Sequence, residues 1–132
     1  MDRKITDLFA KICQTKTNGY RLADIPKGVL IKALTANAIY VLTKTAEGKN
    51  PTVAVSGGLV PKPLIGEFSG STLGGHAIKV GWLGKEMYLE IYLVGGKILT
   101  TSLVQKITLE NSPHEADALI KLAEENTRKK LS

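Results

Sequence analysis

Three consecutive stretches decide the fold: HAIKVGWL at 76–83, EMYLEIYLV at 86–94 and KILTTSLVQK at 97–106. They are separated only by Gly84-Lys85 and Gly95-Gly96. Two-residue links that contain glycine are strong signals for β-hairpins between strand-like segments. The sequence therefore predicts an antiparallel meander of three strands over residues 76–106.

The registers of the two predicted hairpins can be compared. Two-residue turns give these pairs: Trp82 with Met87, Val80 with Leu89, Ile78 with Ile91, Lys79 with Glu90, Leu93 with Ile98, Ile91 with Thr100, and Met87 with Val104. One face then gathers Ile78, Val80, Trp82, Met87, Leu89, Ile91, Leu93, Ile98 and Val104, and the other gathers Lys79, Tyr88, Glu90, Tyr92, Leu99 and Leu103. The two hairpins agree on the apolar face, and they place opposite charges across from each other.

Working outward from the meander, residues 28–45 predict a further hairpin about Ala36-Asn37. The first half of this segment can alternatively form a short helix after residues 24–26, but its β-branched residues favour a strand. TVAVS at 52–56 and PLIGEFS at 63–69 have the pattern of two more short strands bounded by glycine and proline.

Both ends of the chain predict helices. Near the N-terminus, apolar residues recur at helical spacing: Ile5, Leu8, Phe9, Ile12 and Cys13. Near the C-terminus, Ser112, Pro113 and Glu115 supply an N-cap, a proline at the first helical position and a capping-box glutamate. The buried stripe of this second helix is predicted to be Ala116, Leu119, Ile120 and Ala123. We expect one α+β domain over residues 1–132, with a central antiparallel sheet of about six or seven strands and both helices packed on one face.

The composition excludes several classes of protein. A chain of 132 residues fits one domain, and its single cysteine excludes an internal disulfide. No Cys/His pair has the spacing of zinc ligands, so we expect no metal and no cofactor. The charged N-terminus does not resemble a signal peptide, and no apolar run reaches the ~20 residues of a membrane span. The aspartates are few, no nucleophile motif occurs and the glycine-rich loop at 70–75 lacks the P-loop ending, so we do not expect an enzyme.

The net charge of +6 is concentrated in the middle of the chain, where residues 11–106 hold twelve bases and five acids. A basic domain usually has an acidic partner such as nucleic acid, an anionic lipid surface or an acidic protein. Tyr88 and Tyr92 share a predicted face and can stack nucleobases there, but we favour the alternative that a second layer covers them.

One stretch resembles the profilin family: Gly66-Glu67-Phe68-Ser69 followed by residues 71–75, STLGG. Profilins often place a strand, a polar turn ending in Ser/Thr-Gly-Gly and a strand pair before their last helix, and residues 64–131 are similar to this order. The terminal helices, packed together on an antiparallel sheet, also match. Residues 16–62 depart from the family, which usually has another helix there, so the resemblance implies a divergent member such as an archaeal one.

The resemblance implies a cytoplasmic, cytoskeleton-associated protein that binds actin or an actin homologue and so regulates filament assembly. The actin-facing positions implied by the family are Lys79, Lys85, Glu90, Asn111, His114 and Glu115. Profilins also bind phosphoinositides through basic residues, for which the candidates are Lys16, Arg21, Lys27, Lys44, Lys49 and Lys62. Profilins bind proline-rich peptides with aromatic rings of the terminal helices. Here Phe9 is the only such ring and belongs to the core stripe, which disfavours that activity.

Two other functions stay open. The first is a small nucleic-acid-binding protein that uses the face of Tyr88 and Tyr92, which predicts strongly salt-dependent binding of single strands. The second is a structural β protein that dimerises through an open sheet edge. The profilin interpretation predicts a monomer.

Overall fold

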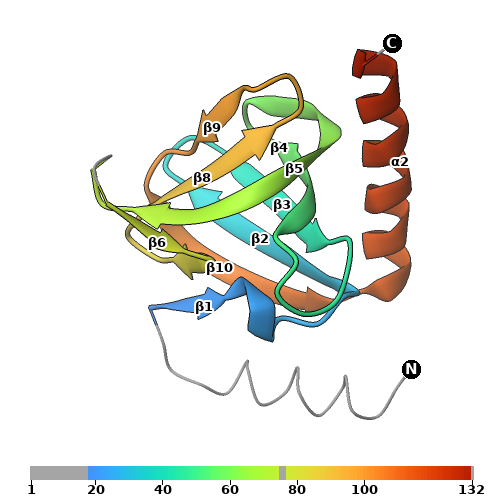
Figure 1. Ribbon diagram of the computed structural model, residues 1–132. Coiled ribbons are helices and arrows are strands. Elements are labelled where there is room, and N and C mark those ends of the chain that lie inside the picture. Colours follow the sequence, from blue (N-terminus) through green and yellow to red (C-terminus); the bar gives the residue numbers. More distant parts are fainter. Residues whose placement is uncertain (1–17, 75–76, 132) are drawn as a thin grey trace.

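The structure, a computed structural model, describes residues 18–74 and 77–131. The predicted N-terminal helix and Lys16 lie outside the described residues. An antiparallel sheet of eight strands is formed by β2 (Val29–Thr35), β3 (Ile39–Lys44), β4 (Thr52–Gly57), β5 (Val60–Thr72), β6 (Ile78–Val80), β8 (Tyr88–Leu93), β9 (Ile98–Thr100) and β10 (Val104–Asn111). A separate two-stranded sheet pairs β1 (Gly19–Arg21) with β7 (Trp82–Gly84), and a short 3₁₀ helix, η1 (Leu22–Asp24), follows β1. The helix α2 (Pro113–Leu131) stands against the large sheet (Figure 1).

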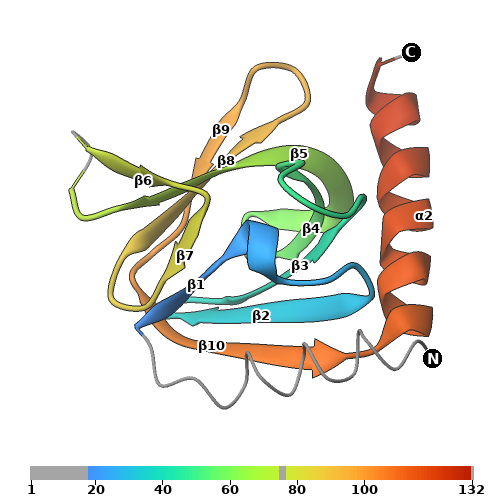
Figure 2. The ribbon, with the colours of Figure 1, turned by 60° about the horizontal axis from the view of Figure 1, so that its bottom comes forward.

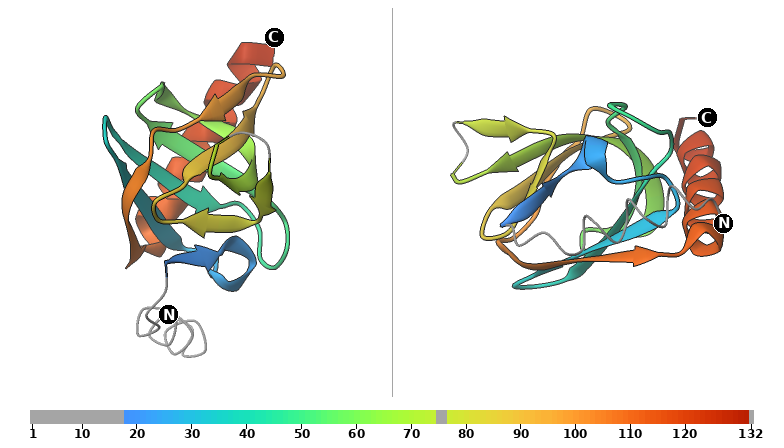
Figure 3. Two further views of the ribbon diagram at one scale, coloured as in Figure 1. Left: turned by 90° about the vertical axis from the view of Figure 1, so that its left-hand side faces the viewer. Right: turned by 90° about the horizontal axis from the view of Figure 1, so that it is seen from below.

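The large sheet is strongly curled around its core. Its strand order is β10-β2-β3-β4-β5-β8-β9, with β6 paired to the second half of β5. The start of β10 curls back to the segment just before β8, where the N–H of Val104 donates to the carbonyl of Met87 at 2.9 Å. The views from the side and from below show the strands wrapping around one interior (Figure 3). The main core, which includes Val29, Leu42, Phe68, Leu89 and Ile91, fills this interior.

The hairpin predicted about Ala36-Asn37 is confirmed as β2 and β3, with Leu34 opposite Ile39. Thr35 stabilises its turn, since the Thr35 hydroxyl accepts the N–H of Ala38 at 3.0 Å. The alternative of a helix in the first half of this segment is wrong. The strands predicted at 52–56 and 63–69 are confirmed as β4 and part of the longer β5.

The hairpin predicted about Gly84-Lys85 is wrong. Gly81 adopts a φ of +70°, which breaks the segment into β6 and β7. β6 pairs with β5, while β7 pairs with β1. The link before β8 does not join β7 and β8 into a hairpin, because the N–H of Lys85 donates to the carbonyl of Asn18 and that of Glu86 donates to the carbonyl of Val104. β8 therefore pairs with β5, and Lys79 does not lie opposite Glu90.

The hairpin predicted about Gly95-Gly96 is present as β8 and β9, but its register is shifted by one residue. The N–H of Leu93 donates to the carbonyl of Lys97 at 2.7 Å, which leaves three loop residues between them. A shift of one residue turns every side chain to the opposite face of the sheet. Leu99 is consequently buried, whereas Ile98, predicted to be internal, is 52% exposed.

The predicted strand at 97–106 is divided in the structure. β9 ends at Thr100, and β10 starts at Val104 and pairs with β2 along Val29–Thr35. This change of partner closes the curled sheet and extends β10 to the start of the helix. Figure 2 shows β10 running beneath β2 toward α2.

The C-terminal helix is confirmed. α2 begins at Pro113, and the N–H of Ala116 donates to the carbonyl of Ser112 at 2.9 Å. Its buried side chains Ala116, Ile120 and Ala123 follow the predicted stripe, and the second of the two cores joins Ile120 and Ala123 to Ala54 on β4. The helix thus covers the outer face of β4 and β5, while the main core lies on the inner face. The observed class is α+β, an antiparallel sheet with one C-terminal helix packed on it among the described residues.

Candidate functional site

A groove of about 730 Å³ opens where three parts of the chain meet: the β4–β5 hairpin, the β8–β9 hairpin and the last turns of α2. In Figure 1 these three parts lie together at the top of the molecule. A volume of this size is within the range of ~300–1,000 Å³ that is usual for ligand-binding pockets. It combines an apolar floor with charged side chains from three parts of the chain.

The floor of the groove is apolar and continuous with the core. It is formed by Leu59, Val60, Leu64, Leu93, Ile98 and Leu99. Val60 and Leu99 belong to the main core and are 2% and 4% exposed, and Leu64 and Leu93 pack against it. A ligand in the groove would therefore bury apolar surface at the end of the curled sheet, which favours binding by ~25 cal/mol per Å².

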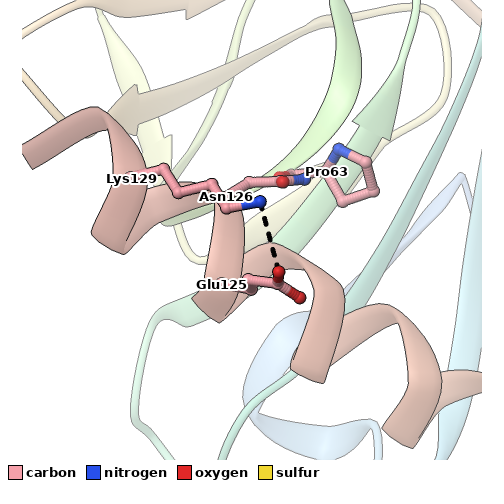
Figure 4. Close-up of polar contacts among 4 residues, drawn as sticks. All are labelled: Pro63, Glu125, Asn126 and Lys129. Carbon is pink, nitrogen blue, oxygen red and sulfur yellow. Dashed lines mark hydrogen bonds and ion pairs between the residues drawn. The ribbon is translucent and has the colours of Figure 1, made fainter.

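All four charged residues that line the groove are lysines. They are Lys62 on β5, Lys97 after the β8 strand, and Lys129 and Lys130 on α2. The Lys129 ammonium nitrogen lies 3.2 Å from a carboxylate oxygen of Glu125, one turn earlier on the helix (Figure 4). The described residues form no ion pair with Lys62, Lys97 or Lys130, so their positive charges are not compensated locally. The groove thus presents positive charge around an apolar floor.

The wall of the groove is fixed by hydrogen bonds between α2 and β5. The side-chain amide of Asn126 donates to the carbonyl of Pro63 at 3.0 Å, and both residues are labelled in Figure 4. The N–H of Ile65 donates to the hydroxyl of Thr127, also at 3.0 Å. On the hairpin side, the N–H of Leu59 donates to the buried Tyr40 hydroxyl at 3.2 Å. These bonds hold α2 and the β4–β5 hairpin at fixed positions on either side of the floor.

Of the predicted lipid-binding residues that the structure describes, only Lys62 belongs to this groove. Arg21 lies on β1, and Lys27 and Lys49 belong to loops at the other end of the sheet, where the N–H of Lys27 donates to Glu47 at 2.6 Å. The structure therefore does not bring the predicted lipid-binding cations together.

Lys44 is placed in the interior, with 1% of its surface exposed. Its ammonium group donates to the carbonyls of Ile25 at 2.9 Å and Gly48 at 2.8 Å. Burial lowers the pKa of Lys44, and this effect outweighs the opposing attraction of Glu47 and Asp24. Because its charge is bonded inside the protein, Lys44 has no role in a surface site, and we remove it from the predicted lipid-binding set.

The residues predicted to face actin fall into separate groups. Lys79, Lys85 and Glu90 are carried by β6, the link after β7, and β8, whereas Asn111, His114 and Glu115 lie where β10 meets α2. Figure 2 shows β6 and α2 at opposite sides of the molecule. The Lys79 ammonium lies 3.9 Å from the centre of the Trp82 ring, so that this cation is held by a neighbour. These positions form no single patch, and their role in binding actin stays a prediction.

Tyr88 and Tyr92 do share the outer face of β8, as predicted. Their surroundings are acidic and not basic, however. Glu90 lies between them on the same face, and Glu67 on β5 is the register partner of Tyr92. Since phosphates repel carboxylates, this face offers little electrostatic support for a nucleic acid.

Sequence analysis missed three of the four lysines in the groove. Lys129 and Lys130 stand in the last turn of α2, where cations are expected for the helix dipole alone. Lys97 follows the glycine pair of a hairpin, where any polar residue fits. Nothing local in the sequence distinguishes these lysines from the others, because only the folded chain brings them together.

Comparisons with family models, curated proteins and solved structures found no match to this chain. Among the described residues, no cluster of three His, Cys, Asp or Glu side chains suits a metal ion. No helix in that part of the chain has the length and apolar character needed to cross a membrane.

Proposed function

We propose that this protein binds an acidic partner in the lysine-rimmed groove and carries out no reaction of its own. One observation supports the proposal most strongly: every charged side chain that lines the 730 Å³ groove is a lysine. The apolar floor supplies the binding free energy, and the lysines select for negative charge. Cavities that combine apolar walls with a few convergent polar groups are typical of binding sites.

The positions of the lysines favour an elongated partner over a point charge. They come from a strand, a hairpin and a helix terminus, so they surround the apolar floor on several sides. A partner that contacts all of them must carry more than one negative charge along its length. Charges of this kind increase the rate of association, and their effect weakens as salt screens them beyond a Debye length of ~8–10 Å.

The proposal retains the two acidic partners that the profilin resemblance implies, an actin-like protein and an anionic phospholipid. It moves the contact away from the residues carried over from the family. Among those of these residues that lie within 18–74 and 77–131, only Lys62 lines the groove.

Binding of a fluorescent acidic peptide, with alternating glutamate and valine and with both ends blocked, tests the proposal. We expect the double substitution Lys97→Gln and Lys130→Gln to weaken binding by about tenfold or more, because two uncompensated charges are lost. Lys85→Gln with Lys106→Gln is the matched control, since both residues are exposed lysines outside the groove. Equal affinity of the two double variants, or binding that does not change with salt, would overturn the proposal.

A further inference from the structure

The edge of the sheet beside the groove has an unpaired strand. β9 pairs with β8 on one side, through Glu90–Thr100, Ile91–Leu99 and Tyr92–Ile98, and it ends the strand order of the large sheet. Its other side has no partner strand among the described residues. Edge strands of this kind are templates for pairing with another chain.

The direction of the backbone groups of β9 follows from the antiparallel pattern. The backbone N–H of Leu93 donates to the carbonyl of Lys97, and the N–H of Thr101 donates to the carbonyl of Leu89. The hydrogen-bonded pairs therefore fall on every second residue of this segment. Leu99, midway between these two, therefore directs its N–H and carbonyl toward β8. The N–H and carbonyl groups of Ile98 and Thr100 point the opposite way, toward the free edge. This edge thus offers two donors and two acceptors to an incoming strand.

This free edge lies inside the groove. Leu99 faces the core and Ile98 faces outward, yet both residues line the same cavity together with Thr100. Because neighbouring residues of opposite orientation line this cavity, we place it along the edge of β9. The opposite wall carries Lys129 and Lys130 on α2, so the backbone edge and the positive charges flank the same space.

We propose that the acidic partner is an extended peptide segment that adds a strand to β9 within this groove, an inference that rests on the proposed function above. Backbone pairing supplies the geometry, alternate apolar side chains fill the floor at Leu64 and Leu93, and the carboxylates face the lysines. An acyl chain of a lipid satisfies none of the four free backbone groups. A second copy of this chain would bring its own four lysines to the same edge, and like charges placed across from each other destabilise strand pairing.

The test uses the blocked peptide of alternating glutamate and valine, and the same peptide N-methylated at every residue, which keeps the charges and side chains but removes the N–H donors. We expect the full-length protein to bind the first peptide and to bind the second at least about tenfold more weakly, the effect of about one hydrogen bond. Exchange of the amide hydrogens of Ile98 and Thr100 should slow when the first peptide is bound. Amides elsewhere on the sheet edge, such as those of β6, should not change.

A pair of variants separates strand addition from binding by charge. Thr100→Pro removes an outward N–H at a position where an edge strand tolerates proline, whereas Thr100→Ala keeps it. We expect a loss of about tenfold for the first and less than about threefold for the second. Urea denaturation of Thr100→Pro verifies that the fold persists, and the amide exchange of the unaltered protein provides a result independent of any variant.

The outcomes are distinct for the two proposals. If the lysine variants lose binding while Thr100→Pro and the N-methylated peptide bind normally, strand addition is overturned and the groove acts through charge alone. If phosphatidylserine vesicles bind and the peptide does not, the occupant is a lipid and strand addition is overturned. Dimerisation that protects the Ile98 and Thr100 amides in the absence of peptide would assign the edge to a second copy. If neither the peptide nor the vesicles bind, β9 is an edge strand without a binding role, and both proposals are wrong.

Discussion

Replacement of Ser71 by alanine tests how the two-stranded sheet is attached to the large one. Ser71 is fully buried on β5, and its hydroxyl donates to the carbonyl of Trp82 and accepts the N–H of Gly84 at 2.9 Å. Both partners belong to β7. One hydroxyl therefore connects the strand that carries it to the two ends of β7.

The magnitude follows from what Ser71→Ala leaves behind. The N–H of the buried Gly84 and the carbonyl of Trp82 each lose a partner, while the volume of the side chain hardly changes. A buried polar group without a partner costs ~1–3 kcal/mol, so we expect the free energy of unfolding to fall by about 2–4 kcal/mol. Such a loss is a large fraction of the ~5–15 kcal/mol that stabilises an ordinary domain.

Urea denaturation followed by circular dichroism measures this change. The midpoint should fall with an unchanged m-value, and the amide of Gly84 should exchange faster because it has lost its acceptor. Ser69→Ala is the matched control, since Ser69 lies two residues earlier on β5, is only half-buried and makes no side-chain hydrogen bond within the described part of the chain. We expect it to change the stability by less than about 0.5 kcal/mol. Equal effects of the two variants would refute the assigned role of the Ser71 hydroxyl.

Three further predictions rest on the structure and one on the profilin resemblance. The pKa of Lys44 is lower in the folded state than the ordinary value of 10.5 in the unfolded chain. At pH values between these two pKa values the unfolded chain binds more protons than the folded protein, so stability should rise with pH in the window below 10.5. The Lys44→Met variant should lack this rise. The free energy of unfolding of the unaltered protein should therefore increase relative to that of the variant from about pH 7 to about pH 10. Parallel curves of the free energy of unfolding against pH would contradict this. Thr127→Val removes the acceptor of the Ile65 N–H at 3.0 Å and should cost about 1 kcal/mol by urea denaturation, whereas an unchanged midpoint would show that this bond contributes nothing to the docking of α2. With carboxylates beside Tyr92, we expect no salt-dependent binding of single-stranded DNA in a gel-shift assay, and binding that Tyr92→Ala abolishes would restore the nucleic-acid interpretation. The profilin resemblance predicts slower spontaneous polymerisation of a cognate actin at equimolar protein, and an unchanged rate of pyrene-actin assembly would remove that prediction.

Local patterns in the sequence were sufficient for several elements. Proline at position 113 and the apolar spacing after it predicted α2 and its buried stripe, because helix signals act within one or two turns. Ala36-Asn37 predicted the β2–β3 turn with its correct register, since this turn is closed by its own neighbours, Thr35 and Ala38. In these elements the residues that stabilise the structure are adjacent in the chain.

The meander at 76–106 was wrong where the stabilising partners are distant. The Gly84-Lys85 link has the composition of a turn, but the backbone at Lys85 and Glu86 is bonded to Asn18 and Val104. At Gly95-Gly96 the turn exists, yet a loop of three residues replaced the expected two and reversed the faces of β9. Composition does not specify loop length, and the burial of Leu99 in a core gathered from the whole sheet decides the register.

The candidate site depended entirely on tertiary structure. By itself the sequence determined an α+β class, a C-terminal amphipathic helix and an excess of positive charge in the middle of the chain. Which lysines lie together was decided only when the sheet curled and α2 docked on β5, bringing Lys62, Lys97 and Lys130 to one groove. The physical reason is that an apolar residue reveals its burial through local periodicity, whereas an exposed lysine has no local signature of the charges that fold next to it.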